Sequence, residues 1–203
     1  MAFRYRIAAT VSALLLGVAP SAVANATTPL AMQTGSTTSQ PIGHYEFCQV
    51  HKADCAEKAQ DTAPPRLTSY GWQLIREVNL AVNRRIVPMT DQQLYGRDEV
   101  WEYPVDAGDC EDFVLEKRRE LIAKGIPEND LLITVVRKPD GEGHAVLTVR
   151  TADGDYILDN LDNQVKIWTD TPYHYLKRQS VTNAGRWVTI ENGQDVVVGA
   201  LRK

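Results

Sequence analysis

The fold is decided by the stretch Ala107-Gly108-Asp109-Cys110-Glu111-Asp112-Phe113. Residues 114–124 follow it with apolar side chains at helical spacing, and Gly125 and Pro127 form a usual helix stop. Cys110 is therefore expected in or just before the first turn of a helix. Free N–H groups and the positive end of the helix dipole favour an anion there, and thiol pKa values fall at such positions. The stretch indicates a reactive cysteine, with a small buried structural cysteine as the alternative.

Two later segments place a histidine and an aspartate in predicted strands. A β-rich run leads through a Pro-Asp-Gly turn into residues 143–150, so that His144 begins a strand. A further turn leads into residues 156–160, where Asp159 closes the next strand. Together with Cys110 they have the order of a triad in which the thiolate attacks, the imidazole moves the proton and the carboxylate orients the imidazole. A packed histidine and a turn-forming aspartate are the alternatives for these two residues taken singly.

The motifs around these residues resemble those of a known family. Gly-Asp-Cys-Glu-Asp-Phe at 108–113, Gly-His-Ala-Val-Leu at 143–147 and Leu-Asp-Asn at 158–160 are similar to the bacterial transglutaminase-like cysteine peptidases. The similarity runs from about residue 70 to residue 180, and the first motif is the specific one. The resemblance implies a papain-like or transglutaminase-like arrangement with Cys110 as nucleophile, His144 as base and Asp159 as orienting acid.

The best-understood members of that family are periplasmic, calcium-dependent proteases that clip large surface adhesins and so release cells from biofilms. By the resemblance, the substrate is an exported or cell-surface protein, with a large adhesin as the candidate. An inner-membrane receptor that binds cyclic diguanylate and sequesters the protease is a further implied partner. Two alternatives stay open, namely transglutaminase-type acyl transfer through the same thioester and a non-enzymatic binding module.

Three carboxylates flank the thiol and pose an electrostatic problem, because their charges raise the pKa of Cys110. Acidic residues suit a helix N-terminus, and each contributes about 0.3–1 kcal/mol there. This explains their presence but does not counter their effect on the pKa of the thiol. Calcium takes carboxylate oxygens as ligands and would cancel the local charge. The resemblance agrees, because calcium lies beside the nucleophile in the adhesin proteases. We therefore expect a calcium ion held by Asp109, Glu111 and Asp112.

Trp101 lies nine residues before the thiol in a connecting segment with little apolar periodicity. Its ring could form a wall of the site, or its indole N–H could donate to an oxyanion together with the backbone N–H of Cys110. The alternative is a packed aromatic side chain whose single donor finds a partner.

The whole chain is consistent with one exported globular domain. It has 203 residues, 43% of them hydrophobic, and a net charge of −4. Residues 1–24 have the basic start, apolar core and small-residue cleavage sites of a signal peptide, and the apolar run is too short to span a membrane well. Without Arg4 and Arg6 the charge becomes −6, and no basic block suggests nucleic acid. We expect a periplasmic or secreted protein without stable membrane insertion, and a monomer by default.

Residues 25–45 are rich in Thr, Ser, Gln, Pro and Gly without a sustained period, which predicts a flexible leader ahead of a peptidase domain over 46–203. Cys48 and Cys55 are the remaining cysteines, and in an oxidising compartment they are expected to form a disulfide. Because His44 and His51 alternate with them at ligand-like spacing, a zinc site is the alternative.

The order of the predicted elements indicates an α+β fold. A helix is expected from Ser69 to Val87, ahead of the nucleophile helix, and strands follow it. Residues 173–178 look like an aromatic and basic loop, and a hairpin is expected around residues 191–193. The resemblance adds that the nucleophile helix packs on an antiparallel sheet. The expected strands are at about 131–136, 144–150, 155–159, 164–168, 186–190 and 195–199.

Overall fold

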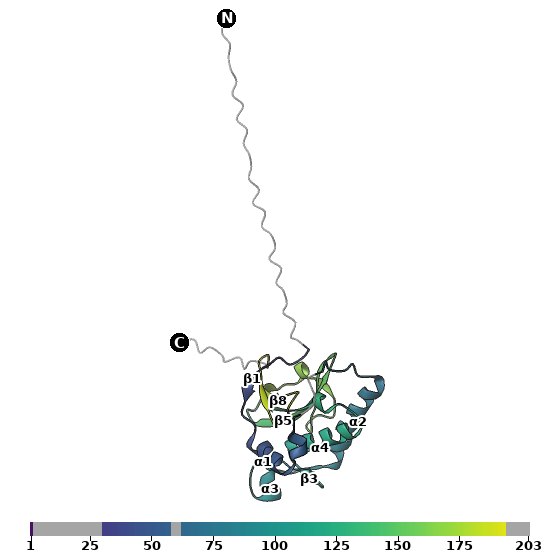
Figure 1. The fold of residues 1–203 in the computed structure, drawn as a ribbon, viewed down its shortest axis with the longest axis vertical. Helices are drawn as coiled ribbons and strands as arrows, with labels where there is room; N and C mark the ends of the chain where they lie inside the picture. The colour runs from purple at the N-terminus through teal and green to yellow at the C-terminus, as the bar shows by residue number, and fades with distance from the viewer. Residues whose placement is uncertain (2–29, 58–61, 194–203) are drawn as a thin grey trace.

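The computed structural model describes Met1, residues 30–57 and residues 62–193 (Figure 1). The signal peptide expected over 1–24 and the strand expected at 195–199 lie outside the described residues. Within the described part, no helix is long and apolar enough to cross a membrane.

A seven-stranded antiparallel sheet forms the centre of the domain, with the strand order β1-β9-β8-β4-β5-β6-β7. Helix α4, which begins at Cys110, and the longer helix α2 come before most of these strands in the chain, so the α+β class is confirmed. The strands are β1 (Thr34–Thr38), β4 (Leu131–Arg137), β5 (Gly143–Thr151), β6 (Gly154–Leu158), β7 (Lys166–Ile167), β8 (His174–Gln179) and β9 (Trp187–Ile190). The helices are α1 (Ile42–Val50), α2 (Ser69–Arg85), α3 (Asp91–Tyr95) and α4 (Cys110–Ala123).

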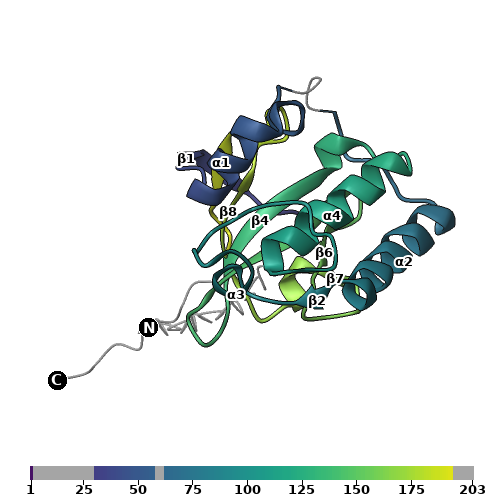
Figure 2. The same ribbon diagram turned by 90° about the horizontal axis from the view of Figure 1, so that it is seen from below.

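Helix α4 covers one face of the sheet and α2 packs against α4 (Figure 2). Alternation along β5 explains the two layers. Ala145, Leu147 and Val149 belong to the hydrophobic cluster that also contains Phe113 of α4. Val146, between them in sequence, belongs to a second cluster on the opposite face. Because both faces of this strand are buried, its register is strongly specified, and the position of His144 is specified with it.

Residues 34–45 differ from the expected flexible leader. Thr34–Thr38 form β1, which pairs with β9 at the edge of the sheet, and helix α1 begins at Ile42. Inside α1, His44 is buried between the rings of Trp101 and Trp187, and Trp187 donates its indole N–H to His44 Nδ1 at 3.3 Å. Burial, and then the charge of Arg118, lower the pKa of His44 to about 3, so this imidazole is neutral. The polar composition of the segment concealed these buried contacts.

One further expectation near the C-terminus was wrong, and another cannot be compared with the described residues. The segment 174–179, which looks like a loop, is strand β8, and it lies in the middle of the sheet between β9 and β4. Strand β9 pairs with β8 and β1. The partner strand of its expected hairpin lies beyond residue 193, outside the described part. Basic and aromatic residues concealed β8 because these side chains reach partners outside the strand, as Arg178 does in its ion pair with Asp155 at 3.1 Å.

We predict that Gly43→Ala destabilises the protein. A Cβ at this position would lie 2.3 Å from Trp101 Cδ1 and 2.6 Å from the Glu99 carbonyl oxygen. Overpacking of this kind costs about 1–3 kcal/mol, and the better helix propensity of alanine, about 1 kcal/mol, offsets only part of it. Urea unfolding measures the change. Gly143→Ala is the control because its Cβ would meet nothing within 4 Å, and equal stability losses in the two variants would contradict the prediction.

Candidate active site

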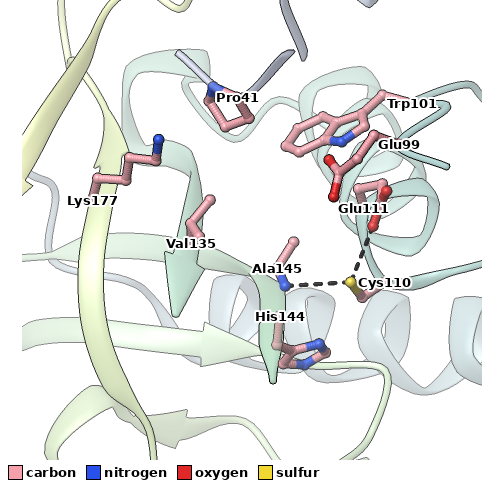
Figure 3. Close-up of a pocket in the computed structure, with 10 residues that line it drawn as sticks. Pro41, Glu99, Trp101, Cys110, Glu111, Val135, His144, Ala145 and Lys177 are labelled. Atoms are coloured by element: carbon pink, nitrogen blue, oxygen red, sulfur yellow. Dashed lines mark hydrogen bonds between the residues drawn. The ribbon is translucent and has the colours of Figure 1, made fainter. Parts of the chain in front are cut away.

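A cavity of about 340 Å³ opens where the N-terminus of α4 meets β5 (Figure 3). Cys110 reaches it from the first residue of α4, and His144 and Ala145 reach it from the start of β5. The remaining lining residues are Pro41, Glu99, Trp101, Glu111, Val135, Gly143 and Lys177. The cavity therefore has an apolar wall, charged groups on its rim and one free thiol at its base.

His144 and Asp159 form a hydrogen-bonded pair on neighbouring strands. The pairing of Leu147 with Leu158 brings the start of β5 beside the end of β6, where Asp159 follows directly. His144 Nε2 lies 2.9 Å from Asp159 Oδ1, and both side chains are buried. Burial alone would raise the pKa of Asp159, but hydrogen bonds, first from His144 and then from Tyr173, hold it below its usual value. The aspartate is thus an anion that accepts from Nε2 and leaves Nδ1 as the available ring nitrogen.

The thiol of Cys110 lies between a donor and an acceptor (Figure 3). It accepts a hydrogen bond from the Ala145 backbone N–H at 3.4 Å and donates one to Glu111 Oε2 at 3.0 Å. Burial raises the pKa of Cys110 well above its ordinary value, and the charge and hydrogen bond of Glu111 raise it further. The favourable effect of the helix N-terminus on the thiolate does not offset this rise in pKa. In this structure the thiol is therefore protonated, as expected for a cysteine surrounded by acids.

The acidic cluster contains a residue that the sequence did not indicate. Asp91, Asp109 and Glu111 each place a carboxylate oxygen within 4.8 Å of the others. Burial, and then the charge of Asp109, raise the pKa of Glu111 to about 9, and burial raises that of Asp112 to about 7. Asp91 begins α3 after the capping box of Thr90, so the sequence offers only a helix-start signal for it.

These carboxylates have the chemistry of a hard-cation site. One buried oxygen on each of Asp91, Asp109 and Asp112 has no hydrogen-bond partner among the described residues. Asp112 uses its other oxygen to accept the Glu102 backbone N–H at 2.9 Å. Buried acids without partners are costly, and oxygen-rich sites of this kind suit calcium. Two of the three expected ligands, Asp109 and Glu111, thus lie around one location together with Asp91. Asp112 lies near this group, since burial, and then the charges of Asp109 and Asp91, raise its pKa.

Trp101 is buried and lines the cavity together with Glu99 and Glu111 (Figure 3). Its indole nitrogen has no hydrogen-bond partner among the residues that the structure describes. The backbone at Gly43 packs directly on this ring. Trp101 therefore forms a fixed wall of the cavity and keeps an unused N–H donor, which leaves the oxyanion role open as a prediction.

Helix α2 supports the segment that carries Asp159. Asn83 donates its amide N–H to the Asp159 carbonyl oxygen at 2.8 Å, and Asn79 donates to the Asp162 carbonyl oxygen at 3.0 Å. Asn79 is fully buried, so this part of the α2 surface packs against the loop after β6. The signal that could have found them is their spacing of four residues on the helix that precedes the nucleophile.

The remaining cysteines lie in α1 and the short helix η1 (Lys52–Cys55). Cys48 and Cys55 form a disulfide, which leaves Cys110 as the free cysteine. His44 approaches both sulfurs of the disulfide, whereas His51 bonds Glu102 at 3.1 Å instead. The four residues of the alternative zinc spacing therefore do not gather as one ligand set.

A nucleophile helix packed on an antiparallel sheet, with the histidine on the adjacent strand, is the arrangement of the transglutaminase-like cysteine peptidases. A model of the bacterial transglutaminase-like cysteine proteinase family, BTLCP, matches residues 34–195, and the chain belongs to this family. It is therefore a transglutaminase-like cysteine peptidase.

Solved structures of a Legionella pneumophila protein are similar to this chain. Calcium-bound Legionella pneumophila LapG is 22% identical, with a TM-score of 0.52, and the match covers 78% of this chain and 86% of that one. It supports the fold. A second Legionella pneumophila LapG structure is 28% identical over 61% of this chain and 70% of that one, with a TM-score of 0.49. No curated protein sequence matches the chain significantly.

Lys117 generates a prediction about pH. It lies two helical turns after Cys110, is fully buried, and its Nζ has no hydrogen-bond partner in the described part of the chain. Burial lowers its pKa to about 7, although the charge of Asp159 opposes this. Between pH 7 and 10.5 the unfolded chain therefore holds the proton that the folded chain has released. The contribution of Lys117 to the free energy of unfolding should rise with pH there, by up to about 1.4 kcal/mol per unit, whatever the slopes that the neighbouring acids add.

Lys117→Met should remove this rise, so that its stability relative to the wild type is greatest below pH 7. Urea unfolding at pH 6.5, 8 and 9.5 measures the effect. Lys124→Met, at an exposed lysine next to the end of the same helix, is the control and should keep the wild-type slope. Parallel curves for the wild type and Lys117→Met would contradict the prediction.

Proposed function

We propose that the chain is an exported cysteine peptidase that cleaves a peptide bond in an exported or cell-surface protein. Cys110, His144 and Asp159 form its triad. The observation that carries this proposal is the buried 2.9 Å hydrogen bond between Asp159 and His144, because His144 lines the cavity that holds the only free cysteine among the described residues. Family membership supports the reaction class.

Each member of the triad has a role that follows from its contacts. Asp159 fixes His144 through Nε2, so Nδ1 is the nitrogen that takes the thiol proton from Cys110. The thiolate attacks the peptide carbonyl, and the backbone N–H of Cys110 and the indole N–H of Trp101 donate to the developing oxyanion. The proton then passes from His144 to the leaving amine, and water hydrolyses the acyl-enzyme.

Calcium dependence is part of the proposal. Asp91, Asp109 and Glu111 would hold the ion, because their carboxylate oxygens share one location. Asp112 would be a further ligand, because one of its buried oxygens, like one on each of Asp91 and Asp109, lacks a partner among the described residues. When bound, calcium supplies positive charge beside the thiol and so favours its ionised form. The similar Legionella pneumophila LapG structure is described as calcium-bound, but the carboxylates of this chain carry the argument.

The substrate and location complete the proposal. The signal-like residues 1–24 and the Cys48–Cys55 disulfide support a periplasmic or secreted protein. The resemblance to the adhesin-cleaving proteases supports a large surface adhesin as substrate and an inner-membrane cyclic diguanylate receptor as regulator. Acyl transfer to an amine and a purely binding role are the competing functions, and the experiment below separates all three.

We predict that the wild-type enzyme with calcium creates new N-termini in an extract of exported proteins, and that Cys110→Ala or excess chelator abolishes them. The physical reason is that cleavage needs an ionised sulfur beside neutralised carboxylates. N-terminal mass spectrometry measures the products, with a tagged primary amine present in every reaction. Tagged glutamines without new termini would instead indicate a transglutaminase. No product of either kind with calcium present would contradict peptidase activity on the proteins tested, and full cleavage in chelator would contradict calcium dependence.

We also predict that Asp91→Asn weakens calcium binding at least about tenfold, because it removes one charged oxygen ligand from the site. Calorimetric titration of the chelator-treated protein with calcium gives the affinity. Asp98→Asn is the matched control, since Asp98 is an exposed acid in the loop after α3. Wild-type affinity in Asp91→Asn would remove this residue from the proposed ligands, and the absence of binding to the wild type would remove the ion itself.

A further inference from the structure

Asp159 is held at both of its carboxylate oxygens. Oδ1 accepts from His144 Nε2 and from the Leu161 backbone N–H, each at 2.9 Å. Oδ2 accepts a short hydrogen bond from the Tyr173 hydroxyl. A carboxylate bonded through one oxygen can still turn about its Cβ–Cγ bond. Donors on both oxygens remove that freedom, so the direction in which Oδ1 meets the imidazole is fixed.

Tyr173 is well placed for this contact. It lies between the short helix η3 (Trp168–Asp170) and β8, and only 7% of its surface is exposed. Its ring also packs against the ring of His144, with the centroids 5.5 Å apart and the planes at 59°. One side chain thus contacts both members of the His144–Asp159 pair.

The hydroxyl of Tyr173 remains a donor over the working pH range. Burial, and then the hydrogen bond to Asp159, raise the pKa of Tyr173 far above its usual value. Because the phenol keeps its proton, it always stabilises the ionised form of Asp159 and disfavours the protonated form. The other charged groups near Asp159 are Lys117 from α4, Asp162 from the loop after β6 and Lys166 from β7.

We propose that Tyr173 is a positioning residue of this peptidase, which orients the Asp159 carboxylate toward His144 and keeps it ionised. The proposal rests on the triad stated above. Removing the Tyr173 hydroxyl frees Oδ2, so the His144 ring loses its fixed direction and Asp159 takes up a proton at higher pH. The alternative is that Tyr173 only fills the hydrophobic cluster to which its ring belongs.

A neighbouring tyrosine provides a matched control. Tyr175 is 1% exposed, belongs to the same cluster, and its hydroxyl lies 2.7 Å from Thr171 Oγ1. Tyr173→Phe and Tyr175→Phe therefore each remove one buried, hydrogen-bonded hydroxyl. Of the two substitutions, only Tyr173→Phe removes a hydroxyl that donates to Asp159. Thermal unfolding of both variants shows whether their losses of stability are comparable.

The test uses hydrolysis of p-nitrophenyl acetate with calcium present, and Cys110→Ala as the blank. We expect Tyr173→Phe to lower kcat/KM about tenfold, as is typical when a residue that orients a functional side chain through a hydrogen bond is removed. The acid limb of the pH profile should move to higher pH. Tyr175→Phe should stay within about twofold of the wild type. Equal effects of the two variants, or an unmoved acid limb in Tyr173→Phe, would overturn the proposal.

Two further measurements test the proposal, one independently of turnover and one for the case in which Tyr173→Phe does not fold. The downfield proton resonance of the His144–Asp159 hydrogen bond, assigned by its loss in Asp159→Asn, should shift or broaden in Tyr173→Phe and stay in Tyr175→Phe, whatever the turnover. If Tyr173→Phe does not fold, 3-fluorotyrosine at position 173 replaces it. The more acidic phenol is a stronger donor and should move the acid limb to lower pH, and no movement would overturn the proposal.

Asp159→Asn separates this inference from the proposed triad. If Asp159→Asn keeps wild-type activity, the triad assignment fails. If Asp159→Asn is inactive while Tyr173→Phe behaves as the wild type, the triad stands and only the role of Tyr173 is overturned.

Discussion

The burial of several carboxylates against one thiol is the constraint on which the site depends. Glu111 accepts the thiol hydrogen at 3.0 Å, and neighbouring acids lie in the same low-dielectric volume. Such a cluster disfavours ionisation of every member, so the acids themselves shift toward their neutral forms. Contacts outside the cluster offset the unfavourable free energy of burying these acids. The core holds α4 in place, and the contacts of Trp101 hold the loop before it. A site built this way responds strongly to any charge that enters it.

The parts of the site that local patterns specify could be read from the sequence. Cys110 is marked by a helix start, and His144 and Asp159 by strand patterns with turn residues between them. Asp91 and Tyr173 could not be read in this way. Asp91 reaches the site from a short capped helix, and Tyr173 reaches it from the end of a loop. No local sequence pattern indicates that either residue lies near the site. Only the packed arrangement shows which polar side chains converge.

The structure of the first residues of the domain could not be predicted from local sequence patterns either. A polar, aperiodic composition normally lacks enough apolar surface to offset chain entropy. Here β1 obtains its stability from pairing with β9, and α1 obtains it from the burial of His44 and Phe47 against aromatic rings. Pro41 consequently reaches the wall of the cavity. A segment that looks dispensable by composition is therefore part of the site.

The pairing of Cys48 with Cys55 has a practical consequence for handling this enzyme. With those two sulfurs bonded to each other, the folded chain offers a single reactive sulfur, and it is the one at the base of the cavity. A simple count of reagent-accessible thiols then reports the concentration of chains whose Cys110 is unmodified, without a substrate. Material made in a reducing cytosol would give a higher count on denaturation, so the same assay also reveals whether the oxidative maturation of the chain is complete.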